Sequence, residues 1–559
     1  MVRMRAWSVM AGVALALCAA GACAQDRATP GSATSSPFQY RGIKGLWWQG
    51  AAGYRRALPW LARNNLNFLM LCYSSFPASG ADWRADYSPD EFREFGEIAA
   101  RGDKLGVEVC LSFNPGLWSR PPLVYCSESD YQLALRKVRL VHQRGIRWFG
   151  LCLDDISRQL EPADQAQFGT LQAAQTHFVN RLWADMKGLR PQPRLIFCPS
   201  VYTTAEARQH LDYIKAVGAG ISPEVMMFWT GPECCSPTIT ARDAREFGAW
   251  IQRKPFVWDN YPVNDMFPWR PLLAPLRNRS ADLGDAVAGY LANPMKQFDA
   301  AQIPLGTTAR YLTDPAHYEP TRALAEVVAG FRPHQRETVG QLVALYGTAF
   351  WSEPNFPPKP RPRTRDEAAR LLPQYKALRA ALSSTQGLKR LRDEVRPTLD
   401  EDIAALERKA RDRLAVSPLR ANGDEFEGGA GEVFGYDKYG RAVNYVYAKP
   451  TGRNAMQTEF ALTEVPSQGA VLRLTARNDD WGTKVKLRIA LNDSALHDGP
   501  SPYAPGDFQT LDFAVPATAL RPGRNTLTLT NLEEQGRLGM PPWFMASAAE
   551  LIPNQPLPR

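Results

Sequence analysis

Two adjacent carboxylic acids, Asp154 and Asp155, directly follow the apolar residues 151–153. Carboxyl groups that share a partly desolvated site tend to separate their pKa values, so that one is ionised while the other holds a proton near neutral pH. Such a pair can do general acid–base work, which is the chemistry that cleaves glycosidic bonds. The same residues could instead do no more than cap the next helix.

Further polar and aromatic residues follow other apolar runs: Tyr202, Thr230, Trp258, Asn260, Asp265 and Asn293. Aromatic faces stack on the CH surfaces of sugars, and Asn and Asp side chains bind hydroxyl and amide groups. Each residue alone has a simpler explanation, because Pro and Asn end strands and Trp fills cores. Their recurrence after successive apolar runs favours one shared binding site.

The elements that would position these residues are eight apolar runs, at 42–48, 66–72, 107–113, 148–153, 195–198, 225–229, 255–258 and 286–291. Most are continuously hydrophobic, as expected for parallel strands buried on both faces. Helical patterns lie between them: Ser88 and Thr240 begin two helices, and Gly145 follows the end of another. The alternation predicts an α/β fold, a (β/α)8 barrel of the TIM type, with its chemistry at the carboxyl ends of the strands. A doubly wound sheet is the alternative, although no Gly-x-Gly-x-x-Gly follows the first strand.

Several motifs occur in a fixed order: Phe149-Gly-Leu-Cys-Leu-Asp-Asp-Ile156, Phe197-Cys-Pro-Ser-Val-Tyr202, Phe228-Trp-Thr-Gly-Pro232, Trp258-Asp-Asn-Tyr-Pro-Val-Asn-Asp265 and Asn293-Pro-Met295. Gln302-Ile-Pro-Leu305 and Tyr311-Leu312 follow them. In these motifs the segment from about residue 40 to 320 resembles the catalytic domain of glycoside hydrolase family 84, the β-N-acetylglucosaminidases that include O-GlcNAcases.

The resemblance implies a retaining, substrate-assisted mechanism, in which the 2-acetamido oxygen of the sugar attacks the anomeric carbon and forms an oxazoline. Asp154 would orient the acetamide N–H as a carboxylate, and Asp155 would be the general acid and then the base. The family's pattern assigns the acetamide pocket to Tyr202, Thr230 and Trp258, the acetamide or its flanking carboxylate to Asn260, and O4 and O6 to Asp265, with Asn293 nearby. It implies no metal and no cofactor.

The chain departs from the family's pattern at the first two strands. Arg41 stands at the family's leading glycine, Lys44 at its glutamate and Ser74 at its lysine. In the family that glycine and lysine hold the O3 side of the sugar. We therefore expect altered tolerance around O3, such as a 3-substituted residue of peptidoglycan or an internal glycan position.

After the predicted barrel, 38–320, the pattern of apolar and polar residues changes twice. Residues 321–420 read as a helical domain, with helices at 324–331, 339–351, 366–390 and 398–414. Residues 421–559 alternate apolar and polar at period two, which predicts a β-sandwich, possibly carbohydrate-binding. Four of its aromatic residues could either stack on glycans or pack in its core: Trp481, Tyr503, Trp543 and Phe544.

Residues 1–24 are typical of a signal peptide, with Arg3 and Arg5 before a short apolar stretch and Ala22-Cys23-Ala24 at the predicted cleavage site. A linker at 25–37 follows. We therefore predict a periplasmic or extracellular protein; a lipoprotein anchored at Cys23 is the less favoured alternative. No later run reaches about 18 apolar residues, so no membrane-spanning segment is expected after removal of the leader.

Seven cysteines remain beyond the leader. Cys72, Cys110, Cys152 and Cys198 lie in strand-like runs, which favours buried free thiols over disulfides. No Cys-x-x-Cys or His-Glu-x-x-His occurs, so we expect no structural zinc.

The composition of the chain limits the classes of partner molecule that we expect. The net charge of +9 is small for 559 residues, and no dense Lys/Arg run occurs, so a dedicated nucleic-acid binder is not expected. The expected partner is a glycan or glycoconjugate substrate; no oligomeric state is indicated.

Three functions remain open at this point. The first is the substrate-assisted hexosaminidase, and the second is a glycan-binding protein that has lost turnover. The third is a hydrolase of another sugar that uses one carboxylate as a direct nucleophile. The Asp154–Asp155 pair favours an enzyme, because a binding protein needs no proton donor.

Overall fold

The structure is a computed structural model, and it describes residues 36–45, 50–117, 119, 121–265, 270–353, 356, 358–360, 362, 364–411, 414, 417–430, 441–479, 484–536 and 541–554. The predicted leader, linker residues 25–35 and Trp481 lie outside the described residues.

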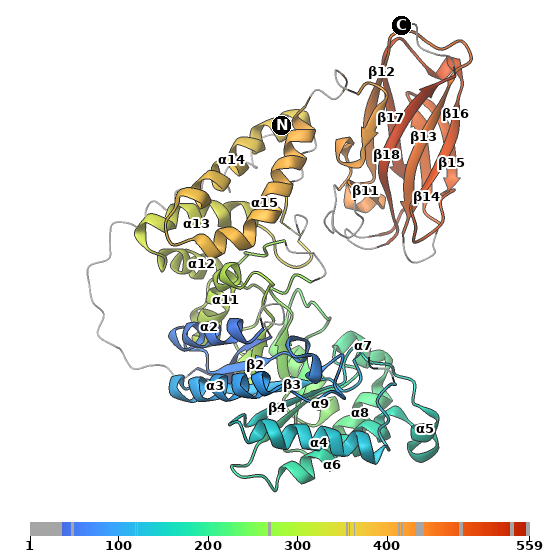
Figure 1. Cartoon of the computed structure of the whole chain (residues 1–559). Coiled ribbons are helices and arrows are strands. Elements are labelled where there is room, and N and C mark those ends of the chain that lie inside the picture. The colour runs from blue at the N-terminus through green and yellow to red at the C-terminus, as the bar shows by residue number, and fades with distance from the viewer. Residues whose placement is uncertain are drawn as a thin grey trace.

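Eight parallel strands close into a barrel, and they follow one another around it in the order of the sequence (Figure 1). The strands are β1 (Tyr40–Lys44), β2 (Phe68–Leu71), β3 (Glu108–Phe113), β4 (Trp148–Cys152), β5 (Arg194–Cys198), β6 (Met226–Trp229), β7 (Phe256–Asp259) and β8 (Gly289–Ala292). Each predicted run overlaps one strand. The predicted (β/α)8 barrel is therefore confirmed, and the doubly wound sheet is excluded.

Helices connect the strands and cover the outside of the barrel: α2 (Gly50–Arg63), α3 (Pro89–Leu105), α4 (Glu128–His142), α5 (Pro162–Phe168), α6 (Leu171–Met186), α7 (Thr204–Gln209), α8 (Leu211–Gly220), α9 (Ala241–Ile251), α10 (Leu283–Ala286) and α11 (Phe298–Thr313). Both predicted helix starts form capping boxes. The hydroxyl of Ser88 accepts from the N–H of Glu91, and that of Thr240 accepts from the N–H of Asp243. Each box satisfies N–H groups that the first helical turn cannot bond.

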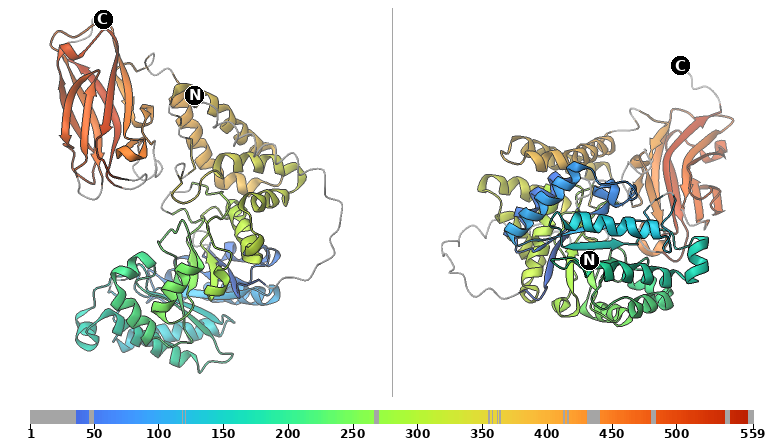
Figure 2. Two further views of the ribbon diagram at one scale, coloured as in Figure 1. Left: turned by 180° about the vertical axis from the view of Figure 1, so that it is seen from behind. Right: turned by 60° about the horizontal axis from the view of Figure 1, so that its bottom comes forward.

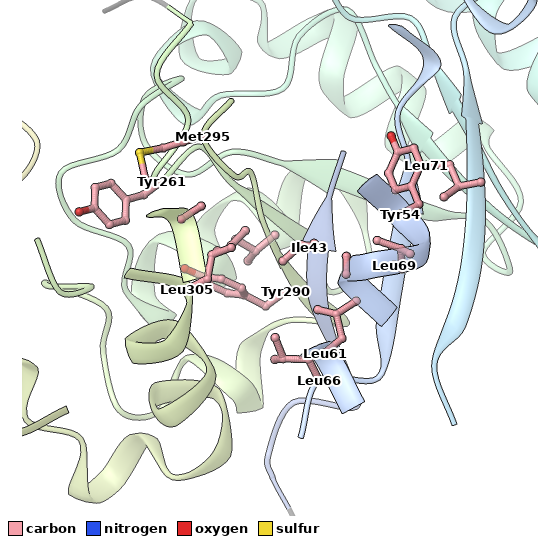
Figure 3. Packing of buried hydrophobic residues seen from close by; sticks show 14 of the residues in the cluster. Ile43, Tyr54, Leu61, Leu66, Leu69, Leu71, Tyr261, Tyr290, Met295 and Leu305 are labelled. Carbon is pink, nitrogen blue, oxygen red and sulfur yellow. The ribbon is translucent and has the colours of Figure 1, made fainter. Parts of the chain in front are cut away.

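Apolar side chains pack on both faces of the barrel sheet, one layer outside it and one layer inside. Strand residues such as Ile43 and Leu69 point outward and pack against helix residues such as Leu61 (Figure 3). Their neighbours along the strands point inward, and Phe68 and Trp148 meet there with ring centroids 5.0 Å apart. Burial on both faces explains why the strands read as continuous apolar runs.

Four further helices follow the barrel: α12 (Pro320–Ala329), α13 (Pro333–Tyr346), α14 (Arg365–Ser384) and α15 (Lys389–Ala410) (Figure 1). Several predicted boundaries are wrong. The predicted helix 339–351 begins at Pro333 and ends at Tyr346. The predicted helix 366–390 ends at Ser384, because the chain turns at Gly387 with a φ of +79°, and the next helix begins at Lys389 rather than at residue 398. Pro397 lies inside α15, so it does not mark a helix start. No helix in the described part of the chain is long and apolar enough to cross a membrane.

The C-terminal part forms two antiparallel sheets, which Figure 2 shows from two further sides. One has the order β10-β12-β17-β14-β15 and the other β11-β18-β13-β16, with β9 pairing β18. The strands are β9 (Arg420–Asn422), β10 (Glu427–Gly428), β11 (Asn444–Tyr447), β12 (Ala455–Leu462), β13 (Ala470–Asn478), β14 (Lys486–Leu491), β15 (Ser494–Pro500), β16 (Gln509–Val515), β17 (Gly523–Asn531) and β18 (Trp543–Pro553).

Three of the four candidate stacking residues of the sandwich are buried. Tyr503 donates its hydroxyl to the carbonyl of Leu474, and its ring lies 5.3 Å from that of Phe544. Trp543 is also buried. These three residues therefore pack in the sandwich and offer no face to a glycan.

A buried ion pair joins the barrel to the helices. The Nη2 of Arg270, in the chain after β7, donates to the two oxygens of Asp402 in α15 at 2.8 and 2.6 Å, and the hydroxyl of Tyr346 in α13 donates to the same carboxylate. The side chains of Arg270 and Asp402 are only 2% and 5% exposed. Full pairing offsets the cost of burying both charges.

We predict that Asp402→Asn lowers the free energy of unfolding by about 3–5 kcal/mol, because it leaves the Arg270 guanidinium buried without its counter-charge. Denaturant titration followed by tryptophan fluorescence measures the loss. Asp400→Asn is the matched control, since Asp400 lies on the same helix in half-exposed pairs with Arg379 and Arg396. Equal losses in the two variants would contradict the prediction.

Candidate active site

The carboxylate of Asp154 lies at the carboxyl end of β4 and is held from two neighbouring strands. The amide of Asn114, just after β3, donates to its Oδ1 at 3.2 Å, and the hydroxyl of Tyr73, just after β2, donates to its Oδ2 at 3.1 Å. Only 7% of Asp154 is exposed. Both oxygens are thus bonded, and the strand ends fix the direction in which the carboxylate points.

Asp155 has a different environment from its neighbour, because the chain bends where β4 ends and the two side chains diverge. Asp155 is exposed, and the hydroxyl of Tyr202, just after β5, donates to its Oδ1 at 3.4 Å. One acid of the pair is therefore buried and fixed, while the other is open to solvent. A rigid acceptor beside an accessible proton carrier is the division of labour that acid–base catalysis needs.

The pKa of Asp154 is raised from 3.8 to about 6, chiefly by burial and then by the charge of Asp155. The ammonium of Lys44, its own backbone hydrogen bond and the hydrogen bond from Tyr73 act in the opposite direction. The raised pKa thus belongs to Asp154, the residue for which the resemblance implies a carboxylate.

An amide network joins the ends of β7 and β8. The indole N–H of Trp258 and the amide of Asn293 both donate to the Oδ1 of Asn260 at 2.9 Å. The Nδ2 of Asn260 donates to the backbone carbonyl of Cys234, in the loop after β6, at 2.9 Å. Because Asn260 is bonded through both atoms of its amide, it holds Trp258 and Asn293 in place.

Thr230 is buried at the end of β6, and its hydroxyl donates to the carbonyl of Glu233 while its N–H donates to the carbonyl of Tyr202. Asp265 is exposed beyond β7. The pKa of Cys235 is raised by its contact with Cys234, by burial, and by the charges of Cys234 and Asp265.

Seven of the eight predicted site residues thus follow the carboxyl ends of barrel strands, and Trp258 is the third residue of β7. Hydrogen bonds join Tyr202 to Asp155, and they join Asn260 to Trp258 and Asn293. Asp154 is bonded by Tyr73 and Asn114 instead. The seven cysteines beyond the leader are free thiols, and the four in the strand-like runs are buried, as expected.

The site also contains residues that the sequence analysis missed. Tyr73 and Asn114 hold Asp154, the loop of Cys234 holds Asn260, and the ammonium of Lys44 lies over the ring of Trp258. Tyr73 and Asn114 carry the signal used for the other residues, since each is a polar or aromatic side chain directly after an apolar run.

The three residues that depart from the family's pattern at the first two strands, Arg41, Lys44 and Ser74, lie in different places. The guanidinium of Arg41 bonds Asn65 and the carbonyl of Phe38, so it points away from the carboxyl end of the barrel. Ser74 is exposed after β2. Lys44 lies in the site, with its ammonium over the rings of Trp258 and Tyr73.

Comparisons with known proteins identify the family of this chain. The profile of the family described as β-N-acetylglucosaminidase matches residues 46–344, which is more than half of the chain. The chain belongs to this family. Its members are glycoside hydrolases, and the resemblance to glycoside hydrolase family 84 is thereby confirmed.

Among curated relatives of this family member, the Protein O-GlcNAcases of Mus musculus and Rattus norvegicus are each 28% identical over 232 residues. The matched region is 41% of this chain and spans only 25% of each relative.

Two solved structures share the fold. A Thermobaculum terrenum O-GlcNAc hydrolase mutant aligns with a TM-score of 0.59 and 24% identity, over 66% of this chain and 83% of that chain. CpGH84B aligns with a TM-score of 0.56 and 19% identity, over 67% and 68% respectively.

The burial of Asp154 should make the stability of the folded chain depend on pH. Its pKa is higher in the folded chain (about 6) than in the unfolded chain (3.8), so the folded chain binds more protons between these values and loses stability as pH rises through this window. Asp154→Asn should therefore be more stable than the wild type at pH 7.5, by on the order of 2–3 kcal/mol, and the difference should vanish near pH 4.

Unfolding curves at a series of pH values test this prediction. Asp103→Asn, on the exposed side of α3, is the control and should track the wild type at every pH. A pH-independent difference between Asp154→Asn and the wild type would show that the carboxylate is not penalised by burial.

Proposed function

We propose that this protein hydrolyses β-linked N-acetylglucosamine with retention of configuration, using the 2-acetamido group of the substrate as the nucleophile. The observation that carries the proposal is the Asp154–Asp155 pair: a buried carboxylate held by two donors beside an exposed one, within the part of the chain that matches the family. The third possibility, a direct carboxylate nucleophile, has less support, because Asp154 lies below the surface with both of its oxygens bonded.

In the first step, the Asp154 carboxylate accepts a hydrogen bond from the acetamide N–H. This draws electron density toward the acetamide oxygen, which forms a bond to the anomeric carbon. The bond from that carbon to the leaving oxygen breaks as Asp155 gives its proton to the leaving oxygen. The products of the step are the free alcohol and an oxazolinium, whose positive charge the Asp154 carboxylate stabilises.

In the second step, the Asp155 carboxylate takes a proton from a water molecule as the water oxygen bonds the anomeric carbon. The bond to the acetamide oxygen breaks, which restores the acetamide and returns Asp155 to its acid form. Two successive inversions at one carbon give net retention.

The surrounding residues would position the sugar. Tyr202, Thr230 and Trp258 face the acetamide in this proposal, and Asp265 and Asn293 bind the far hydroxyls. Because Asn260 is bonded to Trp258, Asn293 and the loop of Cys234, its main contribution is to fix the two side chains that it touches. Exposed Ser74, after β2, agrees with room around O3.

The test is hydrolysis of aryl 2-acetamido-2-deoxy-β-glucosides that differ in leaving group. Asp155→Asn should lose about 10²–10⁴-fold in kcat/KM with poor leaving groups and much less with 4-nitrophenol, because an activated leaving group needs little protonation. Asp154→Asn should lose activity with every leaving group. Asp103→Asn is the control, and a GlcNAc-thiazoline, which mimics the oxazoline, should inhibit the wild type. Equal activity in all variants would refute the assignment.

We also propose that the chain is exported to the periplasm or beyond, on the strength of the charged start, the apolar stretch and the small residues before Gln25. N-terminal sequencing of the protein recovered from its native compartment should begin at Gln25. A lipid-modified Cys23 at the N-terminus would show the lipoprotein alternative instead, and an intact Met1 would overturn export.

A further inference from the structure

Lys44 places a positive charge inside the barrel, at the floor of the site. It is the last residue of β1 and alternates with the outward-facing Ile43, so its side chain enters the interior. Its Nζ lies 3.8 Å from the centroid of the Trp258 ring and 5.2 Å from that of Tyr73. Only 5% of the residue is exposed.

This ammonium is unusual in what surrounds it. Among the described residues, Nζ has no hydrogen-bond acceptor and no ion pair, and its close contacts are the two aromatic faces. Aromatic faces attract a cation, but they do not replace the water that an ammonium loses on burial. A negative charge nearby is therefore needed to make this position favourable.

Asp154 provides that charge. Tyr73 links the two groups, because its ring lies beneath the Lys44 ammonium while its hydroxyl donates to Asp154. The other titratable groups around Asp154 are Asp155, the phenols of Tyr73 and Tyr202, and the thiols of Cys152 and Cys198. None of these becomes positively charged, and Asn114 is neutral. Of the cations in the described part of the chain, Lys44 acts most strongly on Asp154.

We propose that Lys44 is a positioning residue for the reaction: its ammonium, seated on Trp258 and Tyr73, is the counter-charge that keeps Asp154 in the carboxylate form that the acetamide N–H requires. This inference rests on the proposed function and names a residue that the mechanism above does not use.

The proposal resolves a conflict in the site. Burial and the neighbouring Asp155 both favour a protonated Asp154, whereas only the ionised form can accept the acetamide N–H and stabilise the oxazolinium. A fixed cation on the far side of the Tyr73 phenol from its bond to Asp154 reduces this penalty without occupying either carboxylate oxygen. Because Lys44 makes no bond to Asp154, it leaves the geometry set by Tyr73 and Asn114 unchanged.

The test is the pH profile of kcat/KM for 4-nitrophenyl 2-acetamido-2-deoxy-β-glucoside. In Lys44→Met, which keeps the length of the side chain and removes its charge, the acid limb should move upward by about one pH unit. Activity at pH 5 should then fall about tenfold more than activity at pH 8, since one unit of pKa is tenfold in the ionised fraction. Lys104→Met, an exposed lysine in the last turn of α3, should leave the profile in place.

A merely structural role for Lys44 would lower activity equally at all pH values, and a parallel loss would overturn the proposal. Lys44→Gln is the second variant, since its amide is neutral and can bond water if Lys44→Met folds poorly. It should shift the limb in the same direction.

A second measurement, the pH dependence of stability, does not require the protein to be active. The window of pH over which Asp154→Asn gains stability relative to its parent should extend upward by about one unit when the parent is Lys44→Met instead of the wild type. An unchanged window would contradict the role of Lys44 even in a protein without activity. Absence of hydrolysis by the wild type, with a shifted window, would refute the proposed function and leave the Lys44–Asp154 coupling standing.

Discussion

The site depends on the burial of one carboxylate, that of Asp154, at the end of a closed parallel sheet. Water would solvate an exposed carboxylate and weaken any bond that it makes to an amide, so burial strengthens the contact on which the proposed chemistry turns. Burial also opposes ionisation of Asp154. Tyr73 and Asn114, which donate to its two oxygens, and the ammonium of Lys44 nearby favour the ionised form. These three residues come from β1, β2 and β3, whereas Asp154 follows β4. A closed barrel brings the ends of four strands to one carboxylate.

The opposite side of the barrel mouth is organised by neutral groups. Asn260 connects Trp258, Asn293 and the backbone of the loop after β6 through its single amide. The groups that Asn260 joins on this side are an aromatic ring, an amide and a backbone carbonyl, whereas the two acids lie on the other side. The ring of Trp258 belongs to both sides, because its edge bonds Asn260 and its face carries Lys44. A change at this residue would disturb both halves of the site.

Much of this arrangement could be predicted from the sequence, and the reasons are physical. Strands buried on both faces must be apolar throughout, so eight such runs indicated the barrel, and the polar residues after them indicated its active end. Lys44 could not be placed in this way, because its direction depends on strand register, and a slip of one residue would turn it outward. The boundary between α14 and α15 was missed because the break lies at Gly387, whereas Pro397 continues the helix. The burial of Tyr503, Trp543 and Phe544 depends on how two sheets face each other, which no local pattern contains.

The inside of the barrel below the site is lined by four thiols, those of Cys72, Cys110, Cys152 and Cys198. Burial raises the pKa of the last three, and thiol–disulfide exchange proceeds through the thiolate, so closure of the barrel leaves these sulfurs both hidden and unreactive. Before the barrel closes, these thiols lack the protection that burial gives them. In oxidising surroundings, strand pairing and sulfur oxidation therefore compete for the same nascent chain, and a disulfide formed too early would hold two strands out of register. In such surroundings, fast closure of the sheet would protect these thiols and favour the native protein.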